Sequence, residues 1–118
     1  MRKIAKRSDW ETLEKPPEKY ANLEIKRKFT EEEMIKIKRG VIPQSNDDKW
    51  FIFYEDGILY FYRCWSGFCI YWMKFEKQGN DYHVIEARVN RDKQQYVQTN
   101  DEIDLKVLNV LIDSLLHD

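Results

Sequence analysis

The sequence predicts an α+β fold, in which a four-stranded antiparallel meander follows a short helix and a longer C-terminal helix packs on one face of the sheet. Two observations support this prediction. Segments with helical spacing and capping signals flank the stretch between residues 49 and 90. Within that stretch, three dipeptides typical of hairpin turns separate four β-rich runs. They are Asp56-Gly57, Ser66-Gly67 and Gly79-Asn80.

Length and composition bound the class of protein. A chain of 118 residues has the size of one domain, and we expect a polar N-terminal arm over residues 1–28 and a single α+β domain over residues 29–118. No apolar run approaches the roughly 20 residues that cross a bilayer, and no secretory signal is evident. We therefore expect a cytoplasmic protein without a membrane partner. Interleaved charges and a sequence pI of about 6.1 argue against nucleic acid as a partner.

The short helix is marked at both ends. Thr30, followed three residues later by Glu33, forms a capping box in which each side chain accepts a hydrogen bond from the other residue's backbone N–H. Gly40 suits the position after the last helical residue, because glycine adopts positive φ without steric cost. We therefore predict a helix over residues 31–39.

The C-terminal helix is marked by a second capping box and by its apolar stripe. Thr99 and Glu102 have the spacing of the box. Leucine and isoleucine then recur every three or four residues, a pattern that almost always faces a core. We predict a helix from Asn100 to about His117.

The length of the hairpin turns decides which side chains share a face of the sheet. If each turn contains two residues, counting back from the turns pairs Trp50 with Arg63, Cys64 with Cys69, and Tyr62 with Tyr71. One face is then mainly aliphatic, and we assign the C-terminal helix to it. The other is rich in tyrosine and carries a charge pair. We predict an interaction face there, formed by Tyr60, Tyr62, Tyr71, Glu86 and Arg88.

Two explanations of the tyrosine-rich face stay open. A sheet with one wet face should alternate apolar and polar residues, but the second and third strands do not. Either the arm and the helix at 31–39 cover this face, or it is a large exposed patch that binds a protein or a planar ligand. A one-residue error at a turn would exchange the two faces.

Polar groups meet aromatic rings at the turn that follows the second strand. Arg63 is either a surface residue whose stem packs on a neighbouring ring, or a cation that faces an anionic ligand. The second interpretation predicts a pocket beside Arg63. Its ligand-binding residues are Trp50, Arg63 and Trp65, with the arginine on a phosphate and a tryptophan stacked on a base.

No catalytic, metal or cofactor motif is legible. Two cysteines and two histidines distant from each other in the sequence do not make the four-ligand pattern of structural zinc sites. In a reducing cytoplasm, Cys64 and Cys69 are expected as buried thiols that pack as small apolar groups. Nucleophile elbows, phosphate loops and dinucleotide motifs are absent from the sequence. We therefore expect no metal, no cofactor and no catalytic residue.

The run "GVIPQSNDDKWFIFYEDGILYFYRCWSGFCIYWMKFE" resembles a family of small, largely uncharacterised bacterial domains. The family pattern falls on Ile42, Pro43, Asp48, Lys49, Trp50, Phe51, Ile52, Glu55, Leu59, Tyr60, Phe61, Arg63, Trp65, Gly67, Cys69, Ile70 and Tyr71. This chain departs from it with Cys64 in place of Ser and Ser66 in place of Thr. Such domains stand alone or beside ADP-ribosylglycohydrolase-like or macro-type domains, so the resemblance implies a setting of ADP-ribose or NAD metabolism and implies no reaction.

Three functions follow as hypotheses. The first is a non-enzymatic module that binds a protein partner through the aromatic sheet face or through the turn at Arg63 and Trp65. The second is a small-ligand domain for a nucleotide or an ADP-ribose-like molecule, with its site near Arg63 and the two tryptophans. The third is a small enzyme. A homodimer through an edge of the sheet is a further expectation, because the first and last strands of an open meander have unpaired edges.

Overall fold

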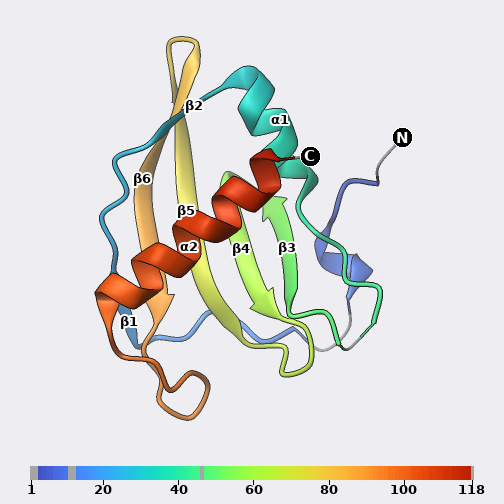
Figure 1. Ribbon diagram of the computed structural model, residues 1–118, viewed down its shortest axis with the longest axis vertical. Coiled ribbons are helices and arrows are strands. Elements are labelled where there is room, and N and C mark those ends of the chain that lie inside the picture. The colour runs from blue at the N-terminus through green and yellow to red at the C-terminus, as the bar shows by residue number, and fades with distance from the viewer. Residues whose placement is uncertain (1–2, 11–12, 46, 118) are drawn as a thin grey trace.

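The computed structural model describes residues 3–10, 13–45 and 47–117, and it shows an antiparallel sheet with a helix lying across one face (Figure 1). Along the chain, the elements are η1 (Arg7–Asp9), β1 (Tyr20–Asn22), β2 (Lys28–Thr30), α1 (Glu31–Arg39), β3 (Trp50–Glu55), β4 (Ile58–Arg63), β5 (Cys69–Gln78), β6 (Asp81–Asn90) and α2 (Asp101–Leu116). The strand order is β1-β6-β5-β4-β3, with β2 also paired to β6. The α+β class is therefore confirmed, but the sheet has six strands instead of four.

The two additional strands come from the segment that we expected in the arm and at its junction with the domain. β1 pairs with residues 88–90 of β6, and β2 pairs with residues 81–83. Strands of three residues are too short to show the alternation that identifies a strand in a sequence. They supply hydrogen-bond partners to the outer edge of β6. The chain before β1, which the structure describes over residues 3–10 and 13–19, is called the arm.

This arrangement changes the prediction of a homodimer through a sheet edge. β6 is an inner strand, because β1 and β2 pair with its outer edge. At β3, the N–H of Val41 donates to the carbonyl of Ile52 at 2.9 Å, and the N–H of Ile52 donates back at 3.0 Å. The expected β6 edge therefore does not exist, and the β3 edge is blocked at its centre.

Both helices follow their end signals, with one difference. The Thr30 capping box forms, and α1 covers the predicted residues. At α2 the cap is Asn100, whose side-chain oxygen accepts from the N–H groups of Glu102 and Ile103 at 2.9 and 3.1 Å. The predicted capping box at Thr99 is wrong, because the helix begins one residue later than that box requires.

The register of the sheet departs from the count at the turn after β4 and at two bulges. β3 and β4 pair as predicted, with Trp50 opposite Arg63. Between β4 and β5, Tyr62 lies opposite Cys69 and Phe61 opposite Tyr71, so that one residue of β5 is unpaired. A second bulge adds a residue to β6 beside Lys74 and Phe75 of β5. The predicted pairs of Cys64 with Cys69 and of Tyr62 with Tyr71 are wrong, because the turn after β4 contains the four residues 64–67 instead of two, so that Tyr62 lies opposite Cys69. Each bulge then shifts the register by one further residue within the strands.

The face under the helices contains the larger core. α2 contributes Leu108, Ile112 and Leu115, and α1 contributes Met34 and Ile37. Figure 1 shows α2 crossing the sheet over β5 and β4. Tyr71, which we predicted on the other face, is wholly buried in this core, because the bulge that precedes it on β5 turns it toward α2.

The opposite face is covered by the arm. Five residues of the sheet and of the turn after β4 are buried there with Ala5, and Trp10 and Leu13 of the arm pack against them. The five are Phe51, Phe53, Tyr62, Cys64 and Cys69. Of the two predicted covers, the arm is confirmed and α1 is not, since α1 lies on the α2 side.

Candidate functional site

Trp50 and Arg63 meet at the end of the sheet where β3 begins and β4 ends. They are directly opposite each other in the register. The guanidinium carbon of Arg63 lies 4.7 Å from the ring centroid of Trp50, within the range of a cation–π contact. Both side chains are half-buried. The structure therefore brings these two predicted site residues together.

The turn after β4 is closed by its own hydrogen bonds. The N–H of Gly67 donates to the carbonyl of Arg63 at 2.9 Å, and the N–H of Arg63 donates to the carbonyl of Phe68 at 3.0 Å. The hydroxyl of Ser66 accepts from the N–H of Phe68 at 3.3 Å. Gly67 has a φ of 73°, a conformation that glycine adopts without steric cost.

The arm and the loop before β3 hold this turn from outside. The N–H of Glu14 donates to the carbonyl of Gly67 at 2.9 Å, and Nε1 of Trp10 donates to the carbonyl of Cys64 at 2.7 Å. The N–H of Cys64 donates to the carbonyl of Lys49 at 3.1 Å. Hydrogen bonds with Glu14, Trp10 and Lys49 therefore hold the turn in place.

Trp65 protrudes from this turn. Its side chain is 71% exposed, the second highest value among the large apolar residues described. No aromatic contact or hydrogen bond within the described ranges involves its indole. A large apolar side chain held on a braced turn and left in solvent is the most conspicuous surface feature at this end of the sheet.

Arg63 has no anionic partner in the described part of the chain. Four other arginines form ion pairs, namely Arg7, Arg27, Arg88 and Arg91. The Nε of Arg63 is buried and lacks a hydrogen-bond acceptor among these residues. A buried donor without a partner is costly, and an anion or an ordered water at the guanidinium would reduce that cost.

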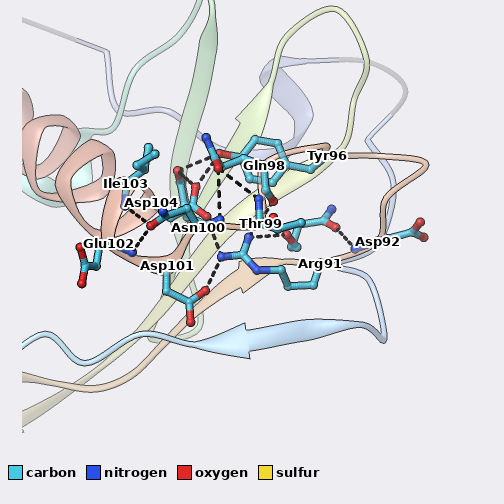
Figure 2. Close-up of polar contacts among 12 residues, drawn as sticks. Arg91, Asp92, Tyr96, Gln98, Thr99, Asn100, Asp101, Glu102, Ile103 and Asp104 are labelled. Atoms are coloured by element: carbon cyan, nitrogen blue, oxygen red, sulfur yellow. Dashed lines mark hydrogen bonds and ion pairs between the residues drawn. The ribbon is translucent and has the colours of Figure 1, made fainter.

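A buried polar network around Asp104 lies next to Trp50 and Arg63. The carboxylate of Asp104, wholly buried on α2, accepts from the hydroxyl of Tyr71 at 2.8 Å and from that of Tyr96 at 2.5 Å. Arg91 forms ion pairs with Asp101 at 2.5 Å and with Asp104 at 2.7 Å, and Figure 2 shows its guanidinium pointing at both carboxylates. This network joins α2 to the sheet and to the loop that precedes the helix.

Tyr71 links the network to the site. Its ring stacks on Trp50, with centroids 5.8 Å apart. Burial and the hydrogen bonds to Tyr96 and Asp104 raise its pKa far above the ordinary range, so the hydroxyl is a donor at any physiological pH. Tyr71 is therefore a structural support for Trp50 and is not part of an exposed interaction face.

The arm covers some of the other predicted interaction residues and leaves the rest accessible. Tyr62 is wholly buried, and its hydroxyl donates to the carbonyl of Glu14 at 2.7 Å. Tyr60 is half-buried beneath Arg7, whose guanidinium carbon is 5.3 Å from the ring. Glu86 and Arg88 remain accessible as an ion pair at 3.6 Å. The tyrosine-rich face therefore is not an open surface, because the arm occupies its centre.

Of the residues that border this covered face, the sequence identified Arg88 but not Tyr20 or Trp72. Trp72 lies opposite Tyr60, on the arm side of the sheet, and the ring of Tyr20 contacts Trp72 at 5.9 Å. Arg88 lies over Tyr20 at 4.4 Å. The bulge that places Trp72 there has no signal in the sequence, whereas Arg7 and Trp10 in the arm would have been candidates to cover an aromatic surface.

The two thiols are poor nucleophiles. Both cysteines are free and buried. Burial raises the pKa of the Cys64 thiol to about 11, and it raises that of Cys69 still further. Among the described residues, no three His, Cys, Asp or Glu side chains are grouped as a metal site would require.

The hollows recorded for the described residues do not include the predicted ligand pocket. The first lies between residues 23–28 and residues 83–87 of β6, with a volume of about 560 Å³. The others border the end of α2, the connection from the arm to β1, and the loop after β6. None of these four hollows is lined by Trp50, Arg63 or Trp65, and the pocket beside Arg63 stays a prediction.

No family model, curated protein or solved structure matches this chain. The resemblance to the bacterial domain family, and the ADP-ribose setting that it implies, therefore stay predictions. No helix within the described ranges is long and apolar enough to span a bilayer.

Proposed function

We propose that this protein is a non-enzymatic interaction module that binds a protein partner through the turn that carries Arg63 and Trp65. The exposed indole of Trp65 is the observation that supports the proposal most directly. Tryptophan and arginine are the residue types most enriched among those that dominate binding energy at protein interfaces. Here they stand two positions apart on one braced turn.

The state of the turn before binding favours this function. Because hydrogen bonds from the arm and from Lys49 already hold it, little conformational entropy remains to be lost on association. Trp65 would insert into an apolar pocket of the partner. Arg63, half-buried over Trp50 and without a carboxylate in the described chain, would meet an acidic group beside that pocket.

A photo-crosslinking residue at position 65 tests this function in cells that express the protein. We expect a discrete crosslinked product that disappears when Arg63→Ala is introduced into the same chain. The matched control is the same crosslinker at Val97, which is 85% exposed and lies on the loop after β6. Crosslinking at 65 that is no stronger or more specific than at 97 would refute the interaction surface.

A second candidate function rests on Arg63 alone. The unpaired guanidinium, with its buried Nε and the ring of Trp50 beneath it, suits the phosphate of a nucleotide or of an ADP-ribose-like molecule. A thermal-shift screen with nucleotides, NAD and ADP-ribose tests it. A ligand at 100 times its Kd stabilises the folded state by about 2.7 kcal/mol.

The arginine variants decide what that screen means. A saturable shift that Arg63→Ala abolishes, and that Arg63→Lys weakens, would establish a small-ligand site that needs the planar fork of arginine. A shift that is unchanged in Arg63→Ala would place the ligand elsewhere. The absence of any shift would leave only the protein-partner function.

A further inference from the structure

The arm is attached to the sheet by a few specific contacts. Arg7 forms an ion pair with Glu55 at 2.9 Å, and its guanidinium carbon lies 4.9 Å from the ring of Phe53. Ala5 is 2% exposed, and its N–H donates to the carbonyl of Arg39 at 2.8 Å. Trp10 and Glu14 complete the attachment through their hydrogen bonds to the turn after β4. All these contacts lie in residues 5–14.

The surface beneath these contacts requires a cover. Phe51, Phe53, Tyr62 and Cys69 have no exposed surface in the structure. Three adjacent aromatic rings would form a continuous apolar patch if the arm were absent, and monomeric proteins rarely expose such a patch. In this structure the arm provides that cover.

The connection between the arm and β1 makes no comparable contacts. In the described chain, residues 15–18 form no hydrogen bond and no ion pair, and the next backbone contact is the N–H of Arg91 to the carbonyl of Lys19 at 2.9 Å. A hollow of about 630 Å³ separates this connection from Asp92 and Gln95. Pro16 and Pro17 have no N–H to donate, and they hold the backbone extended. The connection is a stiff tether.

We infer that the arm exchanges between two copies of this chain, so that each arm covers the aromatic face of the other copy. The contacts of residues 5–14 are the same whether the arm comes from the same chain or from a second one. Only the tether and the concentration of chains then distinguish the closed monomer from the exchanged dimer. Pro16 and Pro17 are half-buried, but no hydrogen bond or ion pair of residues 15–18 in the described chain holds the tether to its own domain, and a proline pair resists a tight return.

Crosslinking between differently substituted chains tests the exchange. Chains with Arg7→Cys are mixed with chains with Glu55→Cys, unfolded and refolded together at high concentration, and treated with a short bis-maleimide. The ion pair shows that these positions are adjacent on the arm and on β3. We expect a product that contains one chain of each kind, and light scattering of the unsubstituted chain refolded alike should show about twice its mass of 14.4 kDa.

The control pair measures random collision. Glu55→Cys is mixed with Val110→Cys, which is 66% exposed on α2, on the face opposite the arm. At least tenfold more mixed product from the 7 and 55 pair than from the 55 and 110 pair is the expected result. Equal yields, together with light scattering that shows only the monomer, would overturn the inference.

The tether provides a second measurement. Replacing Pro16 and Pro17 together by glycine leaves every described hydrogen bond and ion pair of the arm intact and makes the tether flexible. We expect the exchanged fraction to fall, because a flexible tether returns the arm to its own domain more easily. An exchanged fraction that does not change would contradict the role assigned to the proline pair.

Discussion

Tyr71 of β5 and Asp104 of α2 are both wholly buried, and a hydrogen bond of 2.8 Å joins them. It connects the centre of the sheet to the first turn of the helix. Hydrogen bonds to a charged group contribute about 1.5–3 kcal/mol. We therefore expect Tyr71→Phe to lower the free energy of unfolding by about that amount, measured by urea denaturation.

Tyr20→Phe is the matched control for that substitution. Tyr20 is 41% exposed, and its ring contacts to Trp72 and Arg88 do not need the hydroxyl. Its loss should change the free energy of unfolding by less than about 0.5 kcal/mol. Equal losses in the two variants would show that the Asp104 network does not stabilise the fold.

Alanine substitutions at Gly40 and Gly79 test how closely the chain after α1 approaches β3. Both have positive φ, at 63° and 65°. A Cβ on Gly40 would lie 2.0 Å from the carbonyl oxygen of Ile52, whereas a Cβ on Gly79 would meet nothing within 4 Å. We expect Gly79→Ala to cost about 1 kcal/mol for its backbone conformation. Gly40→Ala should cost at least about 2 kcal/mol more, because backbone must move.

Thermal unfolding of the two glycine variants measures this difference. The midpoint of Gly40→Ala should lie well below that of Gly79→Ala, or the variant should fail to fold. Similar midpoints would mean that Gly40 and Ile52 separate at little cost, contrary to the packing described.

The Cys64 thiol should make the protein less stable at alkaline pH. Its folded pKa is raised by burial to about 11, from an ordinary value near 9. The contribution to stability is complete below about pH 9. Above that, the unfolded chain loses the proton first, so the free energy of unfolding should fall as pH rises toward about 11.

Urea denaturation at several pH values between about 8 and 11 measures this dependence. Cys64→Ala removes the thiol, so its free energy of unfolding should fall less steeply over the same range than that of the unsubstituted chain. Cys69 and Tyr71 also have raised pKa values and will leave a residual slope. Parallel curves for the two proteins would contradict the assignment to Cys64.

Trp65 and Trp10 should respond differently to alanine. Trp65 is exposed, so Trp65→Ala should change the free energy of unfolding by less than about 0.5 kcal/mol. Trp10 donates to Cys64 at 2.7 Å and packs against Phe51. Its loss should cost about 2 kcal/mol, from one hydrogen bond and the half-buried ring.

Thermal melts of the two tryptophan variants provide the comparison. A stable Trp65→Ala protein is also required for any binding test at that position. If Trp65→Ala were the more damaging change, Trp65 would be a structural residue and the proposed interaction surface would lose its main support.

Local signals in the sequence predicted α1 and the first hairpin but not the bulges. The capping box of Thr30 and the turn at Asp56-Gly57 act within a few residues, and both α1 and the pairing of Trp50 with Arg63 follow from them. The bulges on β5 and β6 shift the register within the strands and not at a turn. They moved Tyr71 and Trp72 to faces that counting from two-residue turns could not identify.

The candidate site shows the same division. The cation–π contact of Arg63 with Trp50 is local to one hairpin, and the sequence predicted the pairing that makes it possible, while leaving the partner of Arg63 open. Its buried support at Asp104 joins residues more than thirty positions apart, and the cover over Tyr62 comes from Glu14, 48 positions earlier in the chain. Such contacts leave no pattern in the sequence.

The sequence by itself determined the α+β class, the two helices, the four long strands and the hairpin that brings Arg63 to Trp50, because turn and capping preferences act over neighbouring residues. Only the tertiary structure decided which face each aromatic side chain occupies, that β1 and β2 complete the outer edge of β6, and that the arm covers the tyrosine-rich face. These outcomes depend on a bulge of one residue and on contacts between distant segments, whose energies become available only when the whole chain packs together.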